Sequence, residues 1–398
     1  MRFSILIPTF NRADMLRQAI DAALAQSYLH REILVVDDGS TDHTQSVVTG
    51  YGRAVRYLRK ENGGKPSALN LGISASEGEV IIVLDDDDLF PSSAVAKHAE
   101  ALSRNPAADF SYGRFVRFQG TSSLSEGELL DMEFVPTRDP RRLVIKLMEN
   151  CFLPNPTFAV RREAQLKAGP YDDHNFYSPD YDAILRLSRK NEGIFIDDVV
   201  LYQRKHTGYR GPTAERTFIL DTVDKWVKYD TILFNRLDKE WDLSDFRPFS
   251  GEVLSKRDEA LALLQKGVIL FQRKAYGGAM RALGEYRRDL DGRWPSRIEL
   301  RIATGLLSCR YGINDLLAKT GASREIMEAF KAKKWPHLMR AAFAAHIRWR
   351  IRAALTANDV DSAFKLGQFA LRTFGVPATA MVLGSRYAFG ARQWRSSY

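Results

Sequence analysis

The sequence predicts an α/β domain with a mixed sheet flanked by helices, followed by an all-α region. In the first hundred residues, short β-branched runs alternate with amphipathic stretches, a rhythm typical of parallel strands joined by crossover helices. From about residue 253 onward, almost every window has apolar residues at helical spacing. The chain has 398 residues, of which 45% are apolar and 27% charged. This composition is globular and excludes low-complexity disorder, and the length suffices for two domains.

The α/β region begins with an apolar strand and with a helix whose inner face is formed by Leu16, Ile20 and Leu24. The expected strands cover residues 3–7, 33–36, 54–58, 80–84, 110–118, 157–160 and 194–202. The expected helices cover residues 13–26 with Asn11 as a candidate cap, 67–76, a stretch that starts near 91, and 182–189. Residues 80–84 are apolar throughout, as in a strand covered on both faces.

The helical region consists of amphipathic stretches separated by short turns. The expected helices cover residues 260–271, 277–288, 298–308, 326–332, 337–357 and 361–373. Their pairing suits a helical-hairpin repeat, although the similarity between the pairs is weak. We therefore expect a first domain over residues 1–230, a linker over 231–250 and a helical domain over 251–398.

The positive charge of the chain is concentrated near its end. The formal net charge is +9, and residues 325–398 contain twelve Lys and Arg against four Asp and Glu, a net of +8. Within this part, residues 346–352 alternate basic with aromatic and aliphatic side chains. Three interpretations stay open: a nucleic-acid surface, an amphipathic basic helix at an anionic membrane surface, and an ordinary solvated helix face. Nucleic acid is the least favoured partner.

The sequence contains no segment that suggests export or membrane insertion. The apolar run at the N-terminus is broken by Pro8 and is too short for a secretory signal. No window approaches the eighteen or so uncharged residues that span a bilayer. We expect a cytoplasmic protein, with peripheral attachment to the inner face of the cell membrane as an option through the basic tail.

Four consecutive aspartates, residues 85–88, follow the apolar strand at 80–84. Carboxylates this close repel one another, so a site that keeps several ionised normally supplies a cation. In an extended backbone, Asp85 and Asp87 share one face about 6.6 Å apart. This arrangement suits oxygen ligation of Mg²⁺ or Mn²⁺ together with substrate phosphates. The structural alternative is that Asp87 or Asp88 caps the following helix.

A second acidic turn, Asp37–Asp38 before Gly39, ends the second strand. Ligands of parallel α/β sheets bind at the carboxyl ends of strands, so the two acidic turns are expected to face one crevice. A carboxylate there can accept hydrogen bonds from ribose hydroxyls or from a base N–H. The structural alternative is an ordinary Asp-Gly turn.

Four motifs resemble, in order and spacing, those of family 2 of the inverting glycosyltransferases, whose catalytic domain has the GT-A fold, a Rossmann-like mixed sheet. The motifs are ILIPTFNR at 5–12, VVDDGSTD at 35–42, NGGK at 62–65 with ALNLG at 68–72, and LDDDD at 84–88. The resemblance is strong over residues 1–120, weaker to about 210, and absent from the helical tail.

The resemblance implies a site for a nucleoside-diphosphate sugar and a metal ion. The residues that it places around the sugar nucleotide are Pro8, Thr9, Asn11, Asp37, Asp38, Lys65, Asp85 and Asp86. Asp85 and Asp87 would hold Mn²⁺ or Mg²⁺, and Lys65 would meet the phosphates. His206, which follows Tyr202 and Arg204 in a segment similar to one of the family, would complete the metal shell or touch the diphosphate. The alternatives are that Lys65 is simply solvated at the surface and that His206 has no role in the site.

The resemblance also implies a general base for the acceptor hydroxyl. The family carries an acidic pair followed by an aromatic residue and an amphipathic helix, and residues 178–182, SPDYD, match this pattern. Pro179 replaces the first acidic residue. Asp180 is therefore the expected base, with Asp182 as the second candidate and helix capping as the structural alternative for Asp180.

The implied activity is metal-dependent transfer of a sugar to an acceptor hydroxyl, by single displacement with inversion. The expected acceptor is a carbohydrate or a lipid-linked molecule, in the synthesis of cell-surface polysaccharide or glycoconjugate. Two alternatives stay open. One is a regulator that binds nucleotide sugars with little or no transfer, which Pro179 favours, and the other is hydrolysis of the sugar nucleotide.

Overall fold

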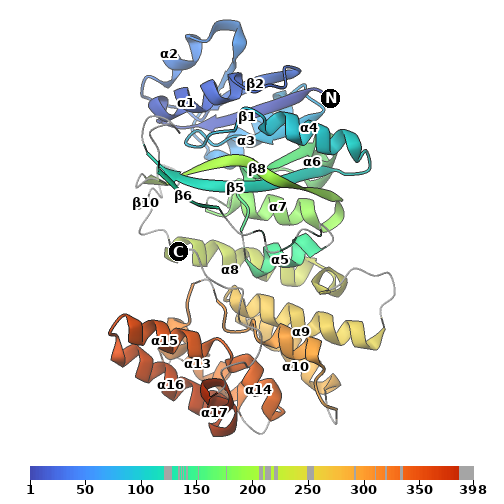
Figure 1. Cartoon of the computed structure of the whole chain (residues 1–398), viewed down its shortest axis with the longest axis vertical. Coiled ribbons are helices and arrows are strands. Elements are labelled where there is room, and N and C mark those ends of the chain that lie inside the picture. The colour runs from blue at the N-terminus through green and yellow to red at the C-terminus, as the bar shows by residue number, and fades with distance from the viewer. Residues whose placement is uncertain are drawn as a thin grey trace. The chain divides into compact units, whose positions relative to one another are not determined.

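The computed structural model of the chain divides into two compact units, Met1–Tyr229 and Asp230–Tyr398 (Figure 1). The structure describes residues 1–120, 128–132, 135, 137, 139, 142–150, 152–175, 177–205, 209–210, 217–218, 223–248, 255–290, 293–309, 311–318, 321–331 and 335–384.

The first unit is built on a mixed sheet in which eight strands are described, in the order β3-β2-β1-β4-β7-β5-β6 with β8 paired to β5. Strands β1 to β4 are parallel, β7 is antiparallel to both β4 and β5, and β8 is parallel to β5. The bounds are β1 Phe3–Thr9, β2 Arg31–Asp37, β3 Arg56–Arg59, β4 Val80–Val83, β5 Phe110–Gln119, β6 Glu128–Met132, β7 Phe158–Arg161 and β8 Gly193–Lys205. The predicted α/β class with a mixed sheet is confirmed.

Helices connect these strands, and the longer ones lie where they were expected. Their bounds are α1 Ala13–Leu24, α2 Thr44–Thr49, α3 Lys65–Ala75, α4 Ala94–Arg104, α5 Leu143–Glu149, α6 Arg162–Ala168 and α7 Pro179–Lys190. Helices α2, α5 and α6 have six or seven residues. Helices this short are not predicted from sequence, because hydrophobic periodicity needs a window of about 11 residues or more.

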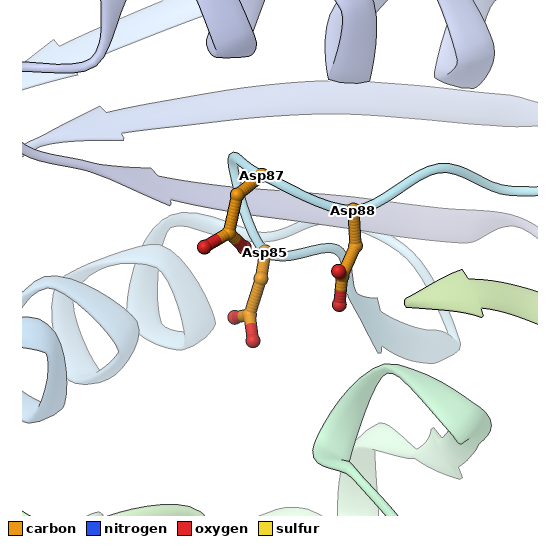
Figure 2. A group of neighbouring side chains, drawn as sticks. All are labelled: Asp85, Asp87 and Asp88. Atoms are coloured by element: carbon orange, nitrogen blue, oxygen red, sulfur yellow. The ribbon is translucent and has the colours of Figure 1, made fainter. Parts of the chain in front are cut away.

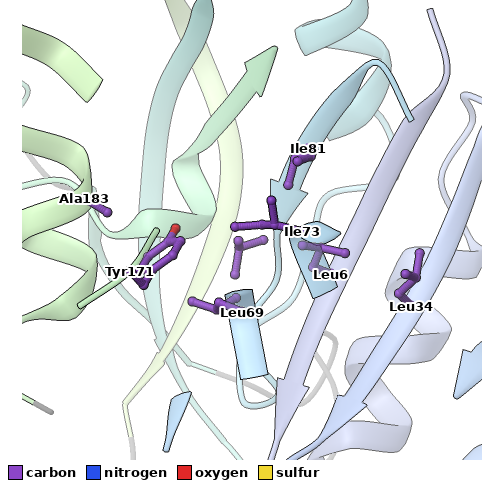
Figure 3. Packing of buried hydrophobic residues seen from close by; sticks show 8 residues of the cluster. Leu6, Leu34, Leu69, Ile73, Ile81, Tyr171 and Ala183 are labelled. Carbon is purple, nitrogen blue, oxygen red and sulfur yellow. The ribbon is translucent and has the colours of Figure 1, made fainter. Parts of the chain in front are cut away.

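One face of the parallel strands is covered by α3 and by the segment leading into α7 (Figure 3). Leu69 and Ile73 of α3 belong to a buried cluster that also contains Leu6 of β1 and Ala183 of α7. Tyr171 is part of the same cluster. Because both helices pack into this cluster, their first residues are brought to the edge where the parallel strands end.

The second unit is helical in its described residues. Helix α8, Val223–Glu240, runs across the boundary between the units, and a short 3₁₀ helix, η6, covers Leu243–Phe246. The remaining bounds are α9 Lys256–Gln272, α10 Tyr276–Asp289, α11 Arg297–Ala303, α12 Asn314–Leu317, α13 Gly321–Phe330, α14 His337–Ala344, α15 Ile347–Thr356, α16 Val360–Phe374 and α17 Val376–Gly384. The single helix expected over 337–357 is two helices, α14 and α15. In the described part of the chain, every helix is too short or too polar to cross a bilayer.

The segment 231–250, expected as a linker, is largely helical. Asp230 on α8 accepts hydrogen bonds from buried Arg273 at 3.2 Å and from the hydroxyl of Tyr311 at 2.6 Å. Phe234 and Leu237, on the same helix, are buried. This half of α8 therefore packs with the second unit, through long-range contacts that local composition does not reveal.

Glu32, near the start of β2, stabilises the edge of the sheet that lies opposite the carboxyl ends of the parallel strands. Its carboxylate accepts hydrogen bonds from Ser4 Oγ at 2.5 Å, from the backbone N–H of Glu77 at 2.6 Å and from Arg56 Nη1 at 2.8 Å. Burial alone would raise the pKa of Glu32, but these hydrogen bonds outweigh it, so the pKa lies below its ordinary value. The ionised carboxylate therefore stabilises the fold above the unfolded-state pKa of about 4.3, and this stability is lost as the pH falls through the lowered folded-state pKa.

Replacing Glu32 by Gln is expected to lower the free energy of unfolding by about 2 kcal/mol at pH 7, because charge-assisted hydrogen bonds are lost. The difference from the parent, measured from urea unfolding, should shrink below about pH 4, where the parent carboxylate is itself neutralised. Glu100→Gln is the control, since Glu100 forms an exposed pair with Arg104 and should change stability by less than about 0.5 kcal/mol. A difference that does not vary with pH would contradict the assignment.

Candidate functional site

Three parallel strands end side by side at one edge of the sheet. Thr9, the last residue of β1, pairs with Asp37, the last residue of β2. The N–H of Leu84, just after β4, donates to the carbonyl of Leu6 at 2.9 Å. The acidic turns at 37–38 and 85–88 therefore lie at the same edge, which is where parallel α/β sheets bind ligands.

The turn at 85–88 gathers three carboxylates on one side (Figure 2). Asp85, Asp87 and Asp88 each offer a carboxylate oxygen, and these atoms all lie within 4.8 Å of one another. The backbone does not stay extended, because the N–H of Asp88 donates to the carbonyl of Asp85 at 3.0 Å. The turn thereby adds Asp88 to the expected pair, and an all-oxygen group of this kind suits a hard divalent cation.

The capping alternative for Asp87 and Asp88 is wrong. Helix α4 begins at Ala94, and Ser93 is the residue that precedes it. The carboxylate of Asp88 instead accepts the backbone N–H of Arg204 at 2.8 Å. The acidic turn is thus tied to the end of β8 and not to the helix that follows it.

Asp86, the remaining aspartate, is held by residues at the end of β1. Its carboxylate accepts hydrogen bonds from Thr9 Oγ1 at 2.8 Å and from Arg12 Nη1 at 2.9 Å. The same nitrogen of Arg12 lies 2.8 Å from Asp87 Oδ2. Burial raises the pKa of Asp86, although Arg12 opposes the shift, and the neighbouring Asp86 raises the pKa of Arg12. Thr9 is thus part of the site, because its hydroxyl donates a hydrogen bond to Asp86.

Arg204, on β8, holds the acidic turn through hydrogen bonds. Its Nε donates to the carbonyl of Asp87 at 2.8 Å and its Nη2 to Gln18 Oε1 at 2.7 Å. The guanidinium lies 4.6 Å from the centroid of the Phe118 ring. Together with the bond from its N–H to Asp88, these contacts fix both the backbone and a carboxylate of the turn.

Neither Arg12 nor Arg204 was named as a site residue from sequence. Arg12 lies inside the first motif, and Arg204 lies two residues before His206. Their positions in these motifs were the only sequence signal that they belong to the site. His206 itself lies outside the described residues, and its expected role stays a prediction.

Lys65, the first residue of α3, joins the two parts of the site. Its Nζ lies 2.7 Å from Asp85 Oδ1 and 2.7 Å from Asp180 Oδ2. Burial raises the pKa of Asp85 to about 6, with Lys65 opposing the shift and Asp180 and Asp87 adding to it. Burial lowers the pKa of Lys65, but the two carboxylates outweigh that effect and raise it overall. The predicted metal ligand and the predicted base thus share one ammonium group.

The two acids predicted on α7 have different surroundings. Pro179 occupies the first turn of the helix, where the missing N–H of proline costs no hydrogen bond. Asp180 follows it and reaches Lys65. Asp182 is buried and accepts a hydrogen bond from Arg186 Nε at 3.0 Å. Asp180 is therefore the carboxylate of this helix that is linked through Lys65 to the acidic turn, and Pro179 is compatible with its place in the first turn of the helix.

Asp38 shapes the loop that leads to Lys65. Its two carboxylate oxygens accept hydrogen bonds from Lys60 Nζ at 2.8 Å, from Asn62 Nδ2 at 3.0 Å, and from the N–H groups of Gly63 at 3.0 Å and Gly64 at 2.7 Å. Four donors use the four lone-pair positions of a carboxylate, so a ribose hydroxyl would have to displace one of them. Gly64, with φ of 88°, then turns the chain into α3.

Asp37, Asn11 and Pro8 connect the strand ends. Asp37 is buried and accepts hydrogen bonds from the N–H of Ser40 at 2.8 Å and from the hydroxyl of Tyr57. Asn11 does not cap α1, because its Oδ1 accepts the N–H of Thr41 at 2.7 Å. Pro8 is buried in β1. Contacts of these residues with a nucleotide stay predictions.

The sequence comparisons agree with the motifs. Residues 4–167 match the family model for glycosyl transferase family 2. An uncharacterised glycosyltransferase of Rickettsia typhi is 32% identical over 221 residues, which cover 53% of this chain and 66% of that protein. Its counterpart in Rickettsia prowazekii is 33% identical over the same shares of the two chains. This chain thus covers slightly less than two thirds of the length of these two relatives.

Among solved structures, residues 1–349 of S. aureus TarS have a TM-score of 0.48 at 14% identity, covering 97% of this chain and 93% of that chain. The family assignment depends on the sequence matches and not on this likeness. The matched residues 4–167 contain the strands β2 and β4, whose ends carry the acidic turns. The chain therefore belongs to glycosyl transferase family 2, through a domain with the GT-A fold in its first unit.

Proposed function

We propose that this chain transfers a sugar from a nucleoside-diphosphate sugar to an acceptor hydroxyl, with inversion at the anomeric carbon. One observation supports this most strongly: in a family 2 domain, Lys65 brings Asp180 together with the carboxylate group at 85–88. A base for the acceptor and a set of oxygen ligands for the donor side therefore lie next to each other.

In this proposal, Asp180 takes the proton from the acceptor hydroxyl. The acceptor oxygen forms a bond to the anomeric carbon while the bond from that carbon to the diphosphate oxygen breaks, and the electron pair leaves with the nucleoside diphosphate. One base suffices for a single displacement. Retention would call for a second, nucleophilic carboxylate on the other face of the sugar.

The residues of the acidic turn fit a divalent metal ion. The carboxylate oxygens of Asp85, Asp87 and Asp88 are hard ligands and lie close enough together to share one ion. We propose Mn²⁺ or Mg²⁺, held by Asp85 and Asp87, with His206 as a further candidate ligand. A bound ion would supply positive charge beside the diphosphate as it leaves. Arg12 already offsets part of the negative charge on Asp87.

The proposed function is tested with a panel of UDP- and GDP-sugars and simple methyl glycosides as acceptors. We expect release of nucleoside diphosphate that depends on both acceptor and Mn²⁺ or Mg²⁺, and that stops when EDTA removes the metal. Donor binding without release would identify a nucleotide-sugar-binding regulator. Release at the same rate without acceptor would identify hydrolysis.

Two substitutions probe separate steps of the proposed reaction. Asp180→Asn should lower kcat by about 10² or more while donor affinity is kept, because a general base is lost. Asp87→Asn should weaken binding of Mn²⁺ and donor by about tenfold or more, equivalent to ~1.4 kcal/mol. Asp198→Asn is the control, since Asp198 pairs with Lys97 on the surface. Unchanged turnover in the Asp180 variant would refute the assignment of the base.

The basic C-terminal helices offer a surface for an anionic membrane, where a lipid-linked acceptor for cell-surface polymer synthesis would be located. On α15, the Trp349 side chain is 48% exposed, and the Arg352 guanidinium lies 5.9 Å from its ring centroid. Arg350, in contrast, donates to the carbonyls of Leu307 and Cys309 and belongs to the fold. The proposed contact therefore involves one side of α15 and not all its arginines.

We expect the chain to co-sediment with phosphatidylglycerol-containing vesicles at low salt and to be released at high salt, because screening weakens surface electrostatics. Replacing Trp349 and Arg352 together by Ala should reduce the bound fraction. Trp294→Ala is the matched control, an exposed tryptophan outside this helix. Binding that is absent, or that is insensitive to salt, would end the idea.

A further inference from the structure

We infer that Lys65 and Asn155 are positioning residues for the carboxylate of Asp180. They hold its two oxygens from different sides, and Lys65 links it to the donor side of the site. The inference rests on the proposed function, because it takes Asp180 as the base. It assigns Lys65 to the base, in place of the phosphate contact that the motif alone suggests.

The Lys65 contacts are short and equal. Its Nζ is 2.7 Å from Oδ2 of Asp180 and 2.7 Å from Oδ1 of Asp85. The side chains of Lys65 and Asp180 are 31% and 28% exposed, so the pair is open to a substrate. An ammonium group has three donors, and charge-assisted hydrogen bonds are about twice as strong as neutral ones. Lys65 can therefore fix one oxygen of Asp180 while the carboxylate stays accessible.

Asn155 contacts the other oxygen of Asp180. It begins the short 3₁₀ helix Asn155–Thr157 and is buried. Its Nδ2 lies 3.4 Å from Oδ1 of Asp180 and donates to the hydroxyl of Tyr171 at 2.9 Å. Because Asn155 is buried, we assign it to orientation of the base and not to contact with substrate.

Tyr171 connects this arrangement back to helix α3. Its ring belongs to the buried cluster under the sheet. Its backbone N–H donates to Asn70 Oδ1 at 2.8 Å, and Asn70 Nδ2 donates to its carbonyl at 2.9 Å. Asn70 and Lys65 are both on α3. Lys65 lies on α3 itself, and Asn155 is connected to the same helix through Tyr171 and Asn70. Both contacts of Asp180 thus depend on α3, which favours a single fixed orientation of the carboxylate.

A fixed orientation matters because proton transfer needs the base within hydrogen-bond reach of the acceptor hydroxyl, and a displacement of about 1 Å can cost about 10² in rate. The expected signature of a positioning residue is a loss in kcat without a loss in donor binding. A lysine that bound the diphosphate would show the opposite pattern, with weaker donor binding.

The test measures kcat and donor KM for Lys65→Met and Asn155→Ala, with the active donor from the panel, and the affinity for UDP and GDP with Mn²⁺ by calorimetry. We expect kcat to fall by about tenfold to hundredfold in both variants. Donor KM and nucleotide affinity should be unchanged in Asn155→Ala and should change much less than kcat in Lys65→Met, which also removes a contact to Asp85. Lys65→Arg should recover most of the rate. Lys97→Met removes an ion pair of the same 2.7 Å length elsewhere in the unit and is expected to leave kcat unchanged.

Three further variants test the inference: Tyr171→Phe, and Lys65→Met and Asn155→Ala each combined with Asp180→Asn. Tyr171→Phe keeps the ring and removes the hydroxyl that Asn155 meets, so it should fold and lower kcat by less than Asn155→Ala. In the Asp180→Asn background, Lys65→Met and Asn155→Ala should have no further effect on the residual rate. The inference would be overturned if Lys65→Met or Asn155→Ala lowered the residual rate of Asp180→Asn by as much as it lowers kcat of the parent. A raised donor KM for Lys65→Met with an unchanged kcat would also overturn it. Full activity of Asp180→Asn alone would instead refute the proposed base.

Discussion

The repulsion among the carboxylates at 85–88 is the constraint on which the rest of the site depends. Four acidic side chains follow the end of one strand, and burial raises the free-energy cost of keeping them ionised. The compensating groups come from three different elements: Arg12 after β1, Lys65 at the start of α3, and Arg204 at the end of β8. Each holds a different part of the turn. The site can therefore keep several acids close together before any metal ion contributes its charge.

Helix α3 connects the hydrophobic core to this charge arrangement. Leu69 and Ile73 anchor it against the parallel strands, which fixes the position of its first turn. Asp38 then determines how the chain enters the helix, because it binds the N–H groups of Gly63 and Gly64. An acidic residue that the motif suggests for ribose is thus used to build the loop. The motif aspartates at 37–38 and at 85–88 have different tasks although they look alike in sequence.

The second unit shows where local patterns mislead. Residues 231–250 were expected to be a linker, yet α8 extends to Glu240. In this helix Asp230 meets Arg273 and Tyr311, and Phe234 is buried. In the basic stretch at 346–352, Arg350 is used inside the fold while Trp349 is exposed. Net charge by itself could not separate structural arginines from surface ones, because their partners are backbone carbonyls far away in the chain.

The sequence by itself determined the α/β class, the main strands, and the placement of the acidic turns at the ends of strands, because these depend on periodicity and on motifs of a few neighbouring residues. It also identified Asp85, Asp87 and Asp180 as candidates. Only the tertiary structure decided which groups meet. Lys65 and Asp180 are 115 residues apart, and Arg204 and Asp88 are 116 apart. Such contacts depend on how α3, α7 and β8 pack against one sheet edge, and no local spacing encodes that packing.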